Sequence, residues 1–520
     1  MAAVSLSFLA PLVLLAIAAL ALSQPGRRPG DLPLWSEYAA LGALGLSAAG
    51  VLQLTAFGPA RLNLMDGVAL FALRADAVSV TLALLVSFIG WIVMRYSRTY
   101  LDGEAREGAF HGLMLATLAA VLVFVQSASL AALALSAIAV GLGLRRLLLF
   151  YDERREAQRA ATKFSLVWHG GDVALAAAAA LLFAAFGTAD LQAIAQAAAS
   201  AELTIGVSAA IALMVVAATL KTAAFPLHGW LTEVMEAPTP VSALLHAGII
   251  NSGGVLLITM SGLVQLSPGA MAALVTLGGF TALFGAAVML TQSAVKTALA
   301  WSTVSQMGFL LLQCGLGLWA LALLHIVAHS LYKAHAFLSS GGAVRAVAGL
   351  RRPGPVAKPS VGAVLKSFSL ALALYAVIAV AFTMILGPKT AQALALGAIL
   401  IFGVAYLVAQ GFADMAPAEL TKRTVRTSVA AAVGYFTFQA VAEGLWGSFL
   451  PAAPTPGPLE WALVVLAVGS FGLVAFAQAL FPLWAHHPAT AGLRVHLANG
   501  LYLNALLDRA IGGFRTRKST

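Results

Sequence analysis

The sequence has few charged residues and almost no cysteine. Charged side chains make up 10% of its 520 residues, whereas a soluble globular domain carries about a quarter. This shortage excludes a soluble nucleotide enzyme and a nucleic-acid-binding domain. The single Cys314 cannot form an internal disulfide, and one thiol cannot build a cysteine-rich metal or iron–sulfur site.

Motifs for enzymatic chemistry are absent from the sequence as well. It contains no GxxxxGK(S/T) loop for phosphates, no Cys/His ligand set for zinc and no glycine run of the Rossmann type. We therefore expect a chain that is not an enzyme and that holds neither a cofactor nor a metal.

Hydrophobic residues make up 61% of the chain and form repeated apolar runs. About 20 apolar residues are enough to cross a bilayer as a helix. The runs predict an all-α polytopic membrane protein with about 14–15 transmembrane helices, some of them broken. The expected spans are approximately 5–22, 37–57, 76–95, 109–127, 128–150, 168–187, 203–224, 240–264, 269–291, 297–316, 318–343, 367–387, 390–410, 427–449 and 460–483.

The basic residues are distributed unevenly between the loops. All but five of the 30 Lys and Arg residues follow odd-numbered spans or belong to the tail. The exceptions are three residues in loops after even-numbered spans and two in apolar runs, namely Arg61, Arg74, Lys389, Lys221 and Lys333. Because cytoplasmic loops carry an excess of Lys and Arg, we expect the N-terminus outside and the C-terminus in the cytoplasm.

Three titratable residues follow one another in the run HIVAHSLYKAH. His325, His329 and Lys333 are spaced four residues apart, so they lie along one helical stripe of about 12 Å. A charge at mid-membrane costs about 2.5–3.5 kcal/mol, which makes such residues candidates for function. Bridged by water, the three groups could pass a proton along part of the bilayer. The alternative is a polar stripe that hydrogen-bonds neighbouring helices, and His335, on another face, is expected to pack.

Prolines interrupt the chain near a second apolar-embedded lysine. Pro226, Pro238 and Pro240 break helical hydrogen bonding close to Lys221. Broken helices at membrane depth survive only where they face protein or a water-filled cavity, and they are common at ion sites. His246 lies two turns beyond Pro240, within reach of Lys221. We expect both to be functional; the alternative is a re-entrant hinge with a snorkelling lysine.

Three acidic residues are candidate modulators of these amines. Asp172, in WHGGDVAL, opens an expected span, so it either caps that helix or pairs with a lysine. Glu236 lies beside the proline break, where it could bias the charge on Lys221. Glu443 lies within an apolar span, where it either faces a cavity or forms a structural pair.

Three segments carry a resemblance to a known superfamily. They are KTAAFPLHGWLTEVMEAPTPVSALLHAGIINSGG, VKTALAWSTVSQMGF and LLHIVAHSLYKAHAFLSSG. Together they resemble the proton-conducting antiporter-like membrane subunits of respiratory complex I and of the Mrp cation/proton antiporters. The resemblance covers residues from about 70 to 345 and implies an antiporter-like fold. It also implies a proton path through Lys221, His246, His325, His329 and Lys333.

Two departures from that pattern indicate one family within the superfamily. Ile138, in AIAVG, occupies the position of the superfamily's essential glutamate, and residues 367–387 lack the usual lysine of a later broken helix. These departures, the segment LGLRRLLLFYDERREAQRAATKF and the short length resemble the DabB-type subunit of bacterial inorganic-carbon transporters. That family implies a bacterial inner-membrane location and a large peripheral DabA-type partner, which contains zinc and is related to β-carbonic anhydrases.

The resemblance implies that this chain is the ion-conducting membrane subunit of a complex that accumulates CO2 or bicarbonate. Proton or sodium influx would drive the accumulation. One alternative is a proton-pumping subunit of a complex I-like or Mrp-type assembly. Another is a structural anchor for a peripheral enzyme. We expect N-terminal spans and a loop in 1–70, the conducting core in 71–345, C-terminal spans in 346–484 and an amphipathic cytoplasmic tail in 485–520.

Overall fold

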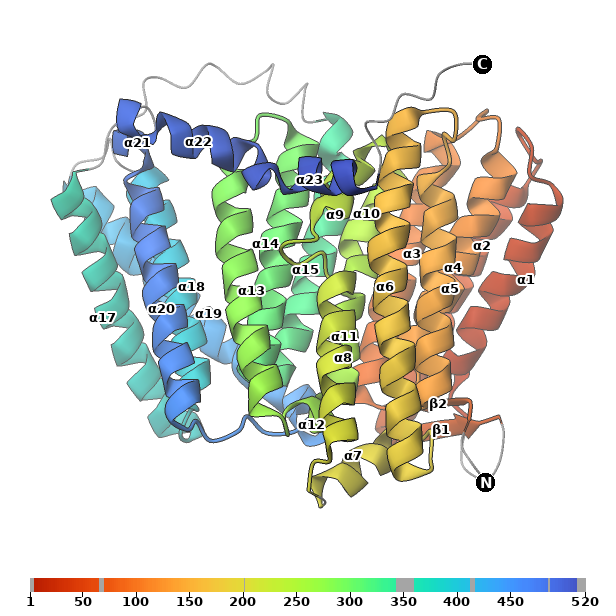
Figure 1. Cartoon of the computed structure of the whole chain (residues 1–520), viewed down its shortest axis with the longest axis horizontal. Helices are drawn as coiled ribbons and strands as arrows, with labels where there is room; N and C mark the ends of the chain where they lie inside the picture. The colour runs from red at the N-terminus through yellow and green to blue at the C-terminus, as the bar shows by residue number, and fades with distance from the viewer. Residues whose placement is uncertain are drawn as a thin grey trace.

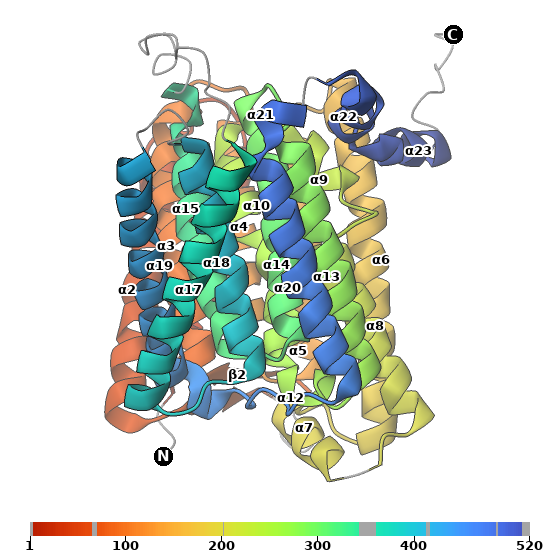
Figure 2. The ribbon, with the colours of Figure 1, turned by 90° about the vertical axis from the view of Figure 1, so that its left-hand side faces the viewer.

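The computed structural model describes residues 4–64, 70–200, 202–342, 360–411, 417–484 and 487–511. Its long helices run side by side in one common direction, and shorter segments cross the two ends of the bundle (Figure 1 and Figure 2). Such an arrangement suits a bilayer, because each helix satisfies its own backbone hydrogen bonds.

Six long helices form the N-terminal part of the bundle. A two-stranded hairpin joins α2 to α3 and pairs Ala60 with Ala75 in antiparallel register. It lies at the same end of the bundle as α7 (Figure 1). The bounds are η1 Leu6–Leu9, α1 Ala10–Ser23, α2 Leu32–Phe57, β1 Ala60–Asn63, β2 Ala72–Ala75, α3 Ala77–Tyr100, α4 Glu107–Val125, α5 Leu130–Leu148, α6 Arg155–Phe186 and α7 Leu191–Ala199.

The middle of the chain contains two interrupted helices. One stops at α8 and resumes as α9, and the other is divided between α10 and α11. Uninterrupted helices α13, α14 and α15 follow. The bounds are α8 Ile205–Lys221, α9 Gly229–Glu233, η2 Val234–Glu236, α10 Thr239–Ala247, η3 Ile249–Asn251, α11 Ser252–Thr259, α12 Ser261–Val264, α13 Pro268–Met289, α14 Val295–Gly315, α15 Trp319–Ser339 and η4 Ser340–Gly342.

Four further long helices and a surface tail complete the described chain. The tail crosses the end of the bundle opposite to the β-hairpin, and α23 lies above α9 (Figure 1). The bounds are α17 Val361–Leu386, α18 Ala391–Gly411, α19 Pro417–Trp446, η5 Gly447–Phe449, α20 Pro458–Ala479, α21 Phe481–Trp484, η6 Pro488–Thr490, α22 Ala491–Ala498, η7 Gly500–Tyr502 and α23 Leu503–Ala510.

Side-chain caps fix the first turns of several helices. Asp76 and Ser79 form a reciprocal capping box at α3, while Ser129 and Thr204 accept hydrogen bonds from the first turns of α5 and α8. Each cap satisfies an N–H that has no partner within its own helix. The caps therefore set where these helices begin.

Glycines allow α13 and α14 to pack closely. A Cβ on Gly278 would collide with the backbone of α14, and one on Gly308 would collide with the backbone of α13. Small residues at such an interface let two helix backbones approach one another in a membrane. This contact holds α14 in place, and α14 also packs against α15.

The all-α polytopic architecture predicted from the sequence is confirmed. In the described part of the chain, 11 helices are long and apolar enough to cross a membrane. The expected spans 203–224 and 390–410 contain the shorter apolar helices Ile205–Lys221 and Ala391–Tyr406. The expected spans 297–316 and 427–449 correspond to α14 and α19.

Several predicted spans begin later than the helices to which they belong, most of all the one expected at 168–187. The span expected at 168–187 belongs to α6, which begins at Arg155 and places Asp172 in its middle rather than at its start. The polar residues before residue 168 hid this longer helix, because they are hydrophilic yet still suit a helix. Asp172 therefore does not cap a helix.

Buried apolar side chains form one large group and smaller ones. The large group joins α1 through α15 and includes Trp446 from α19. A smaller group joins α17 through α20, and another joins α13, α14 and α15 to α18 and α20. The expected boundary near residue 345 lies outside the described residues, so the proposed division into segments stays a prediction. Residues 485–486 and 512–520 of the expected tail also lie outside them.

The ribbon predicts which loops share a side of the membrane. The loop before α6 lies at the tail's end of the bundle, and the loop before α20 lies at the opposite end (Figure 1). We expect a cysteine at exposed Thr455 to react with a membrane-impermeant maleimide in intact cells, and one at exposed Glu153 to react only after permeabilisation. The native Cys314 is buried, so it gives little background. The reverse labelling pattern would contradict the expected orientation.

Candidate functional site

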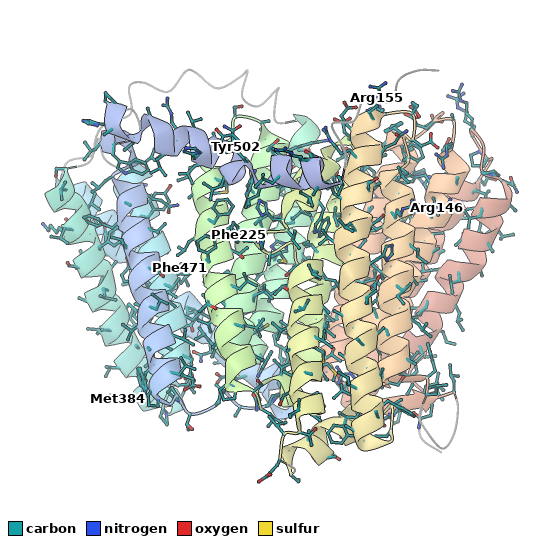
Figure 3. All side chains as sticks on the ribbon, in the orientation of Figure 1. Arg146, Arg155, Phe225, Met384, Phe471 and Tyr502 are labelled. Carbon is teal, nitrogen blue, oxygen red and sulfur yellow. The ribbon has the colours of Figure 1, made fainter. Side chains whose placement is uncertain are left out.

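The first helix break leaves a lysine at the end of α8. Residues 222–228 separate α8 from α9, and the N–H of Phe225 in this segment donates to Thr281 Oγ1 at 3.2 Å. Phe225 lies among the helices of the bundle (Figure 3) and packs against Phe280 and Phe284. The non-helical backbone is thus surrounded by protein, as membrane depth requires.

Lys221 forms a buried ion pair with Asp172. Its Nζ lies 2.5 Å from Asp172 Oδ1, and its side chain is 0% exposed. The other carboxylate oxygen of Asp172 lies 2.8 Å from His169 Nδ1, and Lys221 Nζ lies 4.2 Å from the ring centroid of Trp168. A buried charge is tolerated only with such partners. The three titratable side chains therefore act as one unit, which we call the α6–α8 triad.

The three residues predicted to share a stripe of α15 do share it, and each has a partner on α14. His325 Nδ1 lies 2.7 Å from Gln313 Oε1, and His329 Nδ1 lies 2.7 Å from Gln306 Oε1. Lys333 Nζ donates to the carbonyl oxygen of Leu299 at 3.0 Å. The two imidazole centroids are 5.9 Å apart.

His246 joins this stripe from α10. Its Nδ1 lies 3.1 Å from Thr303 Oγ1, which itself donates to the Leu299 carbonyl. Because Lys333 donates to that same carbonyl, one backbone oxygen connects the lysine to the branch that carries His246. The His246 carbonyl also contacts His329 Nε2 at 3.0 Å. We call His246, His325, His329 and Lys333 the α10–α15 cluster.

The five predicted path residues fall into two groups rather than one. Lys221 belongs to the α6–α8 triad, and the other four belong to the α10–α15 cluster. Among the described residues, no hydrogen bond or ion pair joins Lys221 to His246, although the sequence predicts them within reach of each other. The segment α11 lies between the groups, where Gly253 packs against the backbone of Ala218 in α8.

Two of the predicted modulators lie apart from both groups. Glu236 contacts Arg154 at 3.4 Å and is 43% exposed, so it does not pair with Lys221. Glu443 accepts from Gln439 one turn earlier on α19. Of the three acids, only Asp172 contacts a candidate path residue. His335, expected to pack, is exposed.

A third group of charged side chains, built around a buried lysine, is not predicted from the sequence. Lys163 on α6 is 0% exposed and contacts Glu233 at 2.6 Å and Asp508 at 2.7 Å. Asp508 lies on α23, whose Asn504 donates to Thr232 on α9. The predicted amphipathic tail thus lies against α9 of its own chain. The sequence predicts a later start for α6 and therefore places Lys163 in a loop before it.

Aromatic side chains lie between this charge group and the α6–α8 triad. Phe164, Trp168 and Trp230 contact one another, with ring centroids 5.2–6.1 Å apart. Arg155, at the start of α6, lies at the tail's end of the bundle (Figure 3). The aromatic group therefore separates the charges near that end from Lys221. No group of three or more possible metal ligands occurs in the part of the chain that the structure describes.

Comparisons with known proteins identify relatives of the whole chain. The family described as NADH:quinone oxidoreductase/Mrp antiporter, TM, matches residues 127–352. The family of the N-terminus of complex I chain 5 matches residues 65–111. The chain is 36% identical over 490 residues to the probable inorganic carbon transporter subunit DabB2 of Halothiobacillus neapolitanus, covering 91% of this chain and 87% of that one.

A second relative matches half of the chain, and a solved structure shares its fold. The probable inorganic carbon transporter subunit DabB of Hydrogenovibrio crunogenus is 45% identical over 262 residues, which cover 50% of this chain and 51% of the relative. The Mrp complex from Dietzia sp. DQ12-45-1b contains a chain of similar fold, with a TM-score of 0.63 and 21% identity. That match covers 99% of this chain and 61% of the other.

The buried ion pair predicts a strong effect of removing one partner. Asp172→Leu leaves the Lys221 amine without its carboxylate in a buried setting, so we expect a loss of about 3–5 kcal/mol of unfolding free energy. The double variant Asp172→Leu/Lys221→Met should recover most of it, as measured by denaturation in detergent. As a control, Asp152→Ala breaks an exposed pair with Arg106 and should cost about 0–1 kcal/mol. Equal losses in the single and double variants would contradict the stabilising ion pair between the two charges.

Proposed function

Since this chain belongs to the DabB family of inorganic carbon transporter subunits, within the antiporter-like membrane subunits, we propose that it conducts ions for a complex that accumulates inorganic carbon. Protons or sodium ions move inward across the bacterial inner membrane, and the chain lies with its N-terminus outside and its C-terminus in the cytoplasm. CO2 or bicarbonate is the accumulated substrate.

The observation that carries this proposal is the burial of titratable groups at membrane depth. The side chains of Lys221 and Lys333 are both 0% exposed, and His246 and His329 are buried beside them. Each such group costs free energy in a membrane protein and is therefore a functional candidate. A scaffold would be more stable with apolar residues at these positions.

The α6–α8 triad supplies one proton-holding unit. Asp172 divides its two oxygens between Lys221 and His169, so a proton gained by one partner weakens the carboxylate's attraction for the other. Opening the Lys221 ion pair releases the amine toward the next group. Ile138 leaves this lysine without the glutamate that the superfamily uses, and Asp172 takes that charge-pairing role.

The α10–α15 cluster supplies the second unit. Hydrogen bonds from α14 hold the two α15 imidazoles and Lys333 along one stripe, at the spacing that bridging water molecules can connect. The proposed route passes through Lys333, His329, His325, Lys221 and His246.

A peripheral partner couples this conduction to carbon accumulation. We propose that this partner is a large zinc-containing subunit of the DabA type, which is related to β-carbonic anhydrases and hydrates CO2. Ion passage drives a conformational or protonation change in that subunit, so that hydration proceeds in one direction only. Zinc belongs to the partner, and this chain is the transporting half without enzymatic chemistry of its own.

The second candidate function is proton pumping in a complex I-like or Mrp-type assembly. It is favoured by the family match over residues 127–352 and by the fold shared with an Mrp complex chain. Copurification separates the two. A zinc protein related to carbonic anhydrase supports the first function, whereas quinone-linked or iron–sulfur subunits support the second.

The test is uptake of labelled inorganic carbon in cells that express this chain with its partner. Lys221→Met and Lys333→Met should each lower uptake about tenfold or more, because each removes a proton-transfer group. Lys333→Arg should also fail, since arginine keeps its charge but does not release a proton. An uncoupler should abolish uptake in the unmodified complex.

The matched control is Lys389→Met, which removes a lysine from a loop outside both groups. It should leave uptake unchanged, with membrane content of every variant checked by immunoblot. Uptake that persists in all the lysine variants and with the uncoupler would overturn ion coupling. If it then disappears on deletion of the tail, the chain is a structural anchor.

A further inference from the structure

His329 has a fixed hydrogen-bond partner on one side of its ring. Its Nε2 lies 3.0 Å from the backbone carbonyl oxygen of His246. A carbonyl oxygen only accepts hydrogen bonds, so Nε2 carries a hydrogen in this arrangement. A backbone carbonyl does not take up a proton at neutral pH. Proton exchange by His329 is therefore limited to its other nitrogen, Nδ1.

The partner of Nδ1 is a side-chain amide, which can both donate and accept. Gln306 Oε1 lies 2.7 Å from Nδ1. With its oxygen facing the ring, Gln306 accepts from a protonated Nδ1 and fits the imidazolium form. With its NH2 group facing the ring, it donates to the lone pair of Nδ1 and fits the neutral form. Either form of His329 is thus satisfied by one orientation of the same amide.

We infer that Gln306 is a positioning residue that holds His329 in both of its protonation states, through a half-turn of its side-chain amide. This inference rests on the proposed ion conduction. In the forward step, a proton leaves the Lys333 ammonium or the His325 imidazolium and binds Nδ1 of neutral His329, whose Nε2–H is retained. The donor becomes neutral, the ring becomes an imidazolium and the amide oxygen turns toward it. The reverse step returns the proton from Nδ1.

His325 lacks this constraint. Its Nδ1 also faces a glutamine oxygen, that of Gln313, but in the described part of the chain its Nε2 has no protein hydrogen-bond partner. Its ring borders a largely apolar cavity of about 400 Å³ between α15 and α19. Because either nitrogen of His325 can carry the hydrogen, the orientation of Gln313 need not follow its protonation. Of these two glutamine–histidine pairs, only Gln306 and His329 couple the orientation of the amide to the protonation of the ring.

Few titratable groups surround His329. His325 and Lys333 face it from its own helix, and His246 faces it from α10. From α14 it meets the uncharged Gln306. Among the described residues, α3, α11 and α19, which also pack on α15, add no charged group that acts on it. A change at residue 306 thus alters the stability of the imidazolium directly.

The experiment measures proton flux into vesicles that contain the full complex, with a pH-sensitive dye as probe and an imposed membrane potential. Gln306→Met has a similar shape but neither donates nor accepts, so flux should fall about tenfold or more. Gln306→Glu keeps an acceptor oxygen but has no hydrogen to donate to neutral His329, so it should favour the imidazolium, lower flux at neutral pH and move the pH profile upward by about one unit. The control is Gln265→Met, which removes another glutamine–ring hydrogen bond, with Trp319, and should leave flux unchanged.

The outcomes separate this inference from the proposed function. Flux that is lost in Lys333→Met but normal in Gln306→Met, with an unshifted pH profile in Gln306→Glu, would overturn the role of Gln306 alone. Absence of proton flux through the unmodified complex would also overturn the role of Gln306, and only the absence of both proton and sodium flux would overturn the proposed ion conduction as well. If Gln306→Met does not reach the membrane, the pH profile of Gln306→Glu decides the question, because a purely structural glutamine would not move it.

Discussion

Every polar group inside a bilayer must find its partner within the protein, because lipid tails offer none. This constraint accounts for the arrangement of the charged side chains described above. Lys221 has Asp172, Lys163 has Glu233 and Asp508, and Lys333 has the carbonyl of Leu299. The helix breaks obey the same rule, since their freed backbone groups lie against neighbouring helices.

Helix α14 orients the α10–α15 cluster, although its own sequence is almost uncharged. Through Gln306, Gln313, Thr303 and the carbonyl of Leu299 it contacts each member of the α10–α15 cluster. Its glycine contacts with α13 hold it rigidly on the other side. A helix without a charged residue beyond its first turn thus orients four titratable side chains. The chemistry of the cluster depends on which nitrogen of each ring α14 engages.

Part of this could be predicted from the sequence, for physical reasons. Apolar runs separated by basic loops revealed the helices, and the spacing of four residues revealed the stripe on α15, because both patterns are local. The partner of Lys163 was invisible, since Asp508 lies far away in sequence on a separate helix. The start of α6 was missed because hydropathy detects burial in lipid rather than helix formation. Gln306 and Gln313 carry no charge, so they gave no signal of their own.

The contact between α23 and the body of the bundle has a consequence for biogenesis. Lys163 is synthesised hundreds of residues before Asp508, one of its two carboxylate partners. Until then the lysine depends on Glu233 alone, and the region around α9 lacks the cover of α23. Helix α23 therefore completes an electrostatic contact whose first partners are synthesised hundreds of residues earlier.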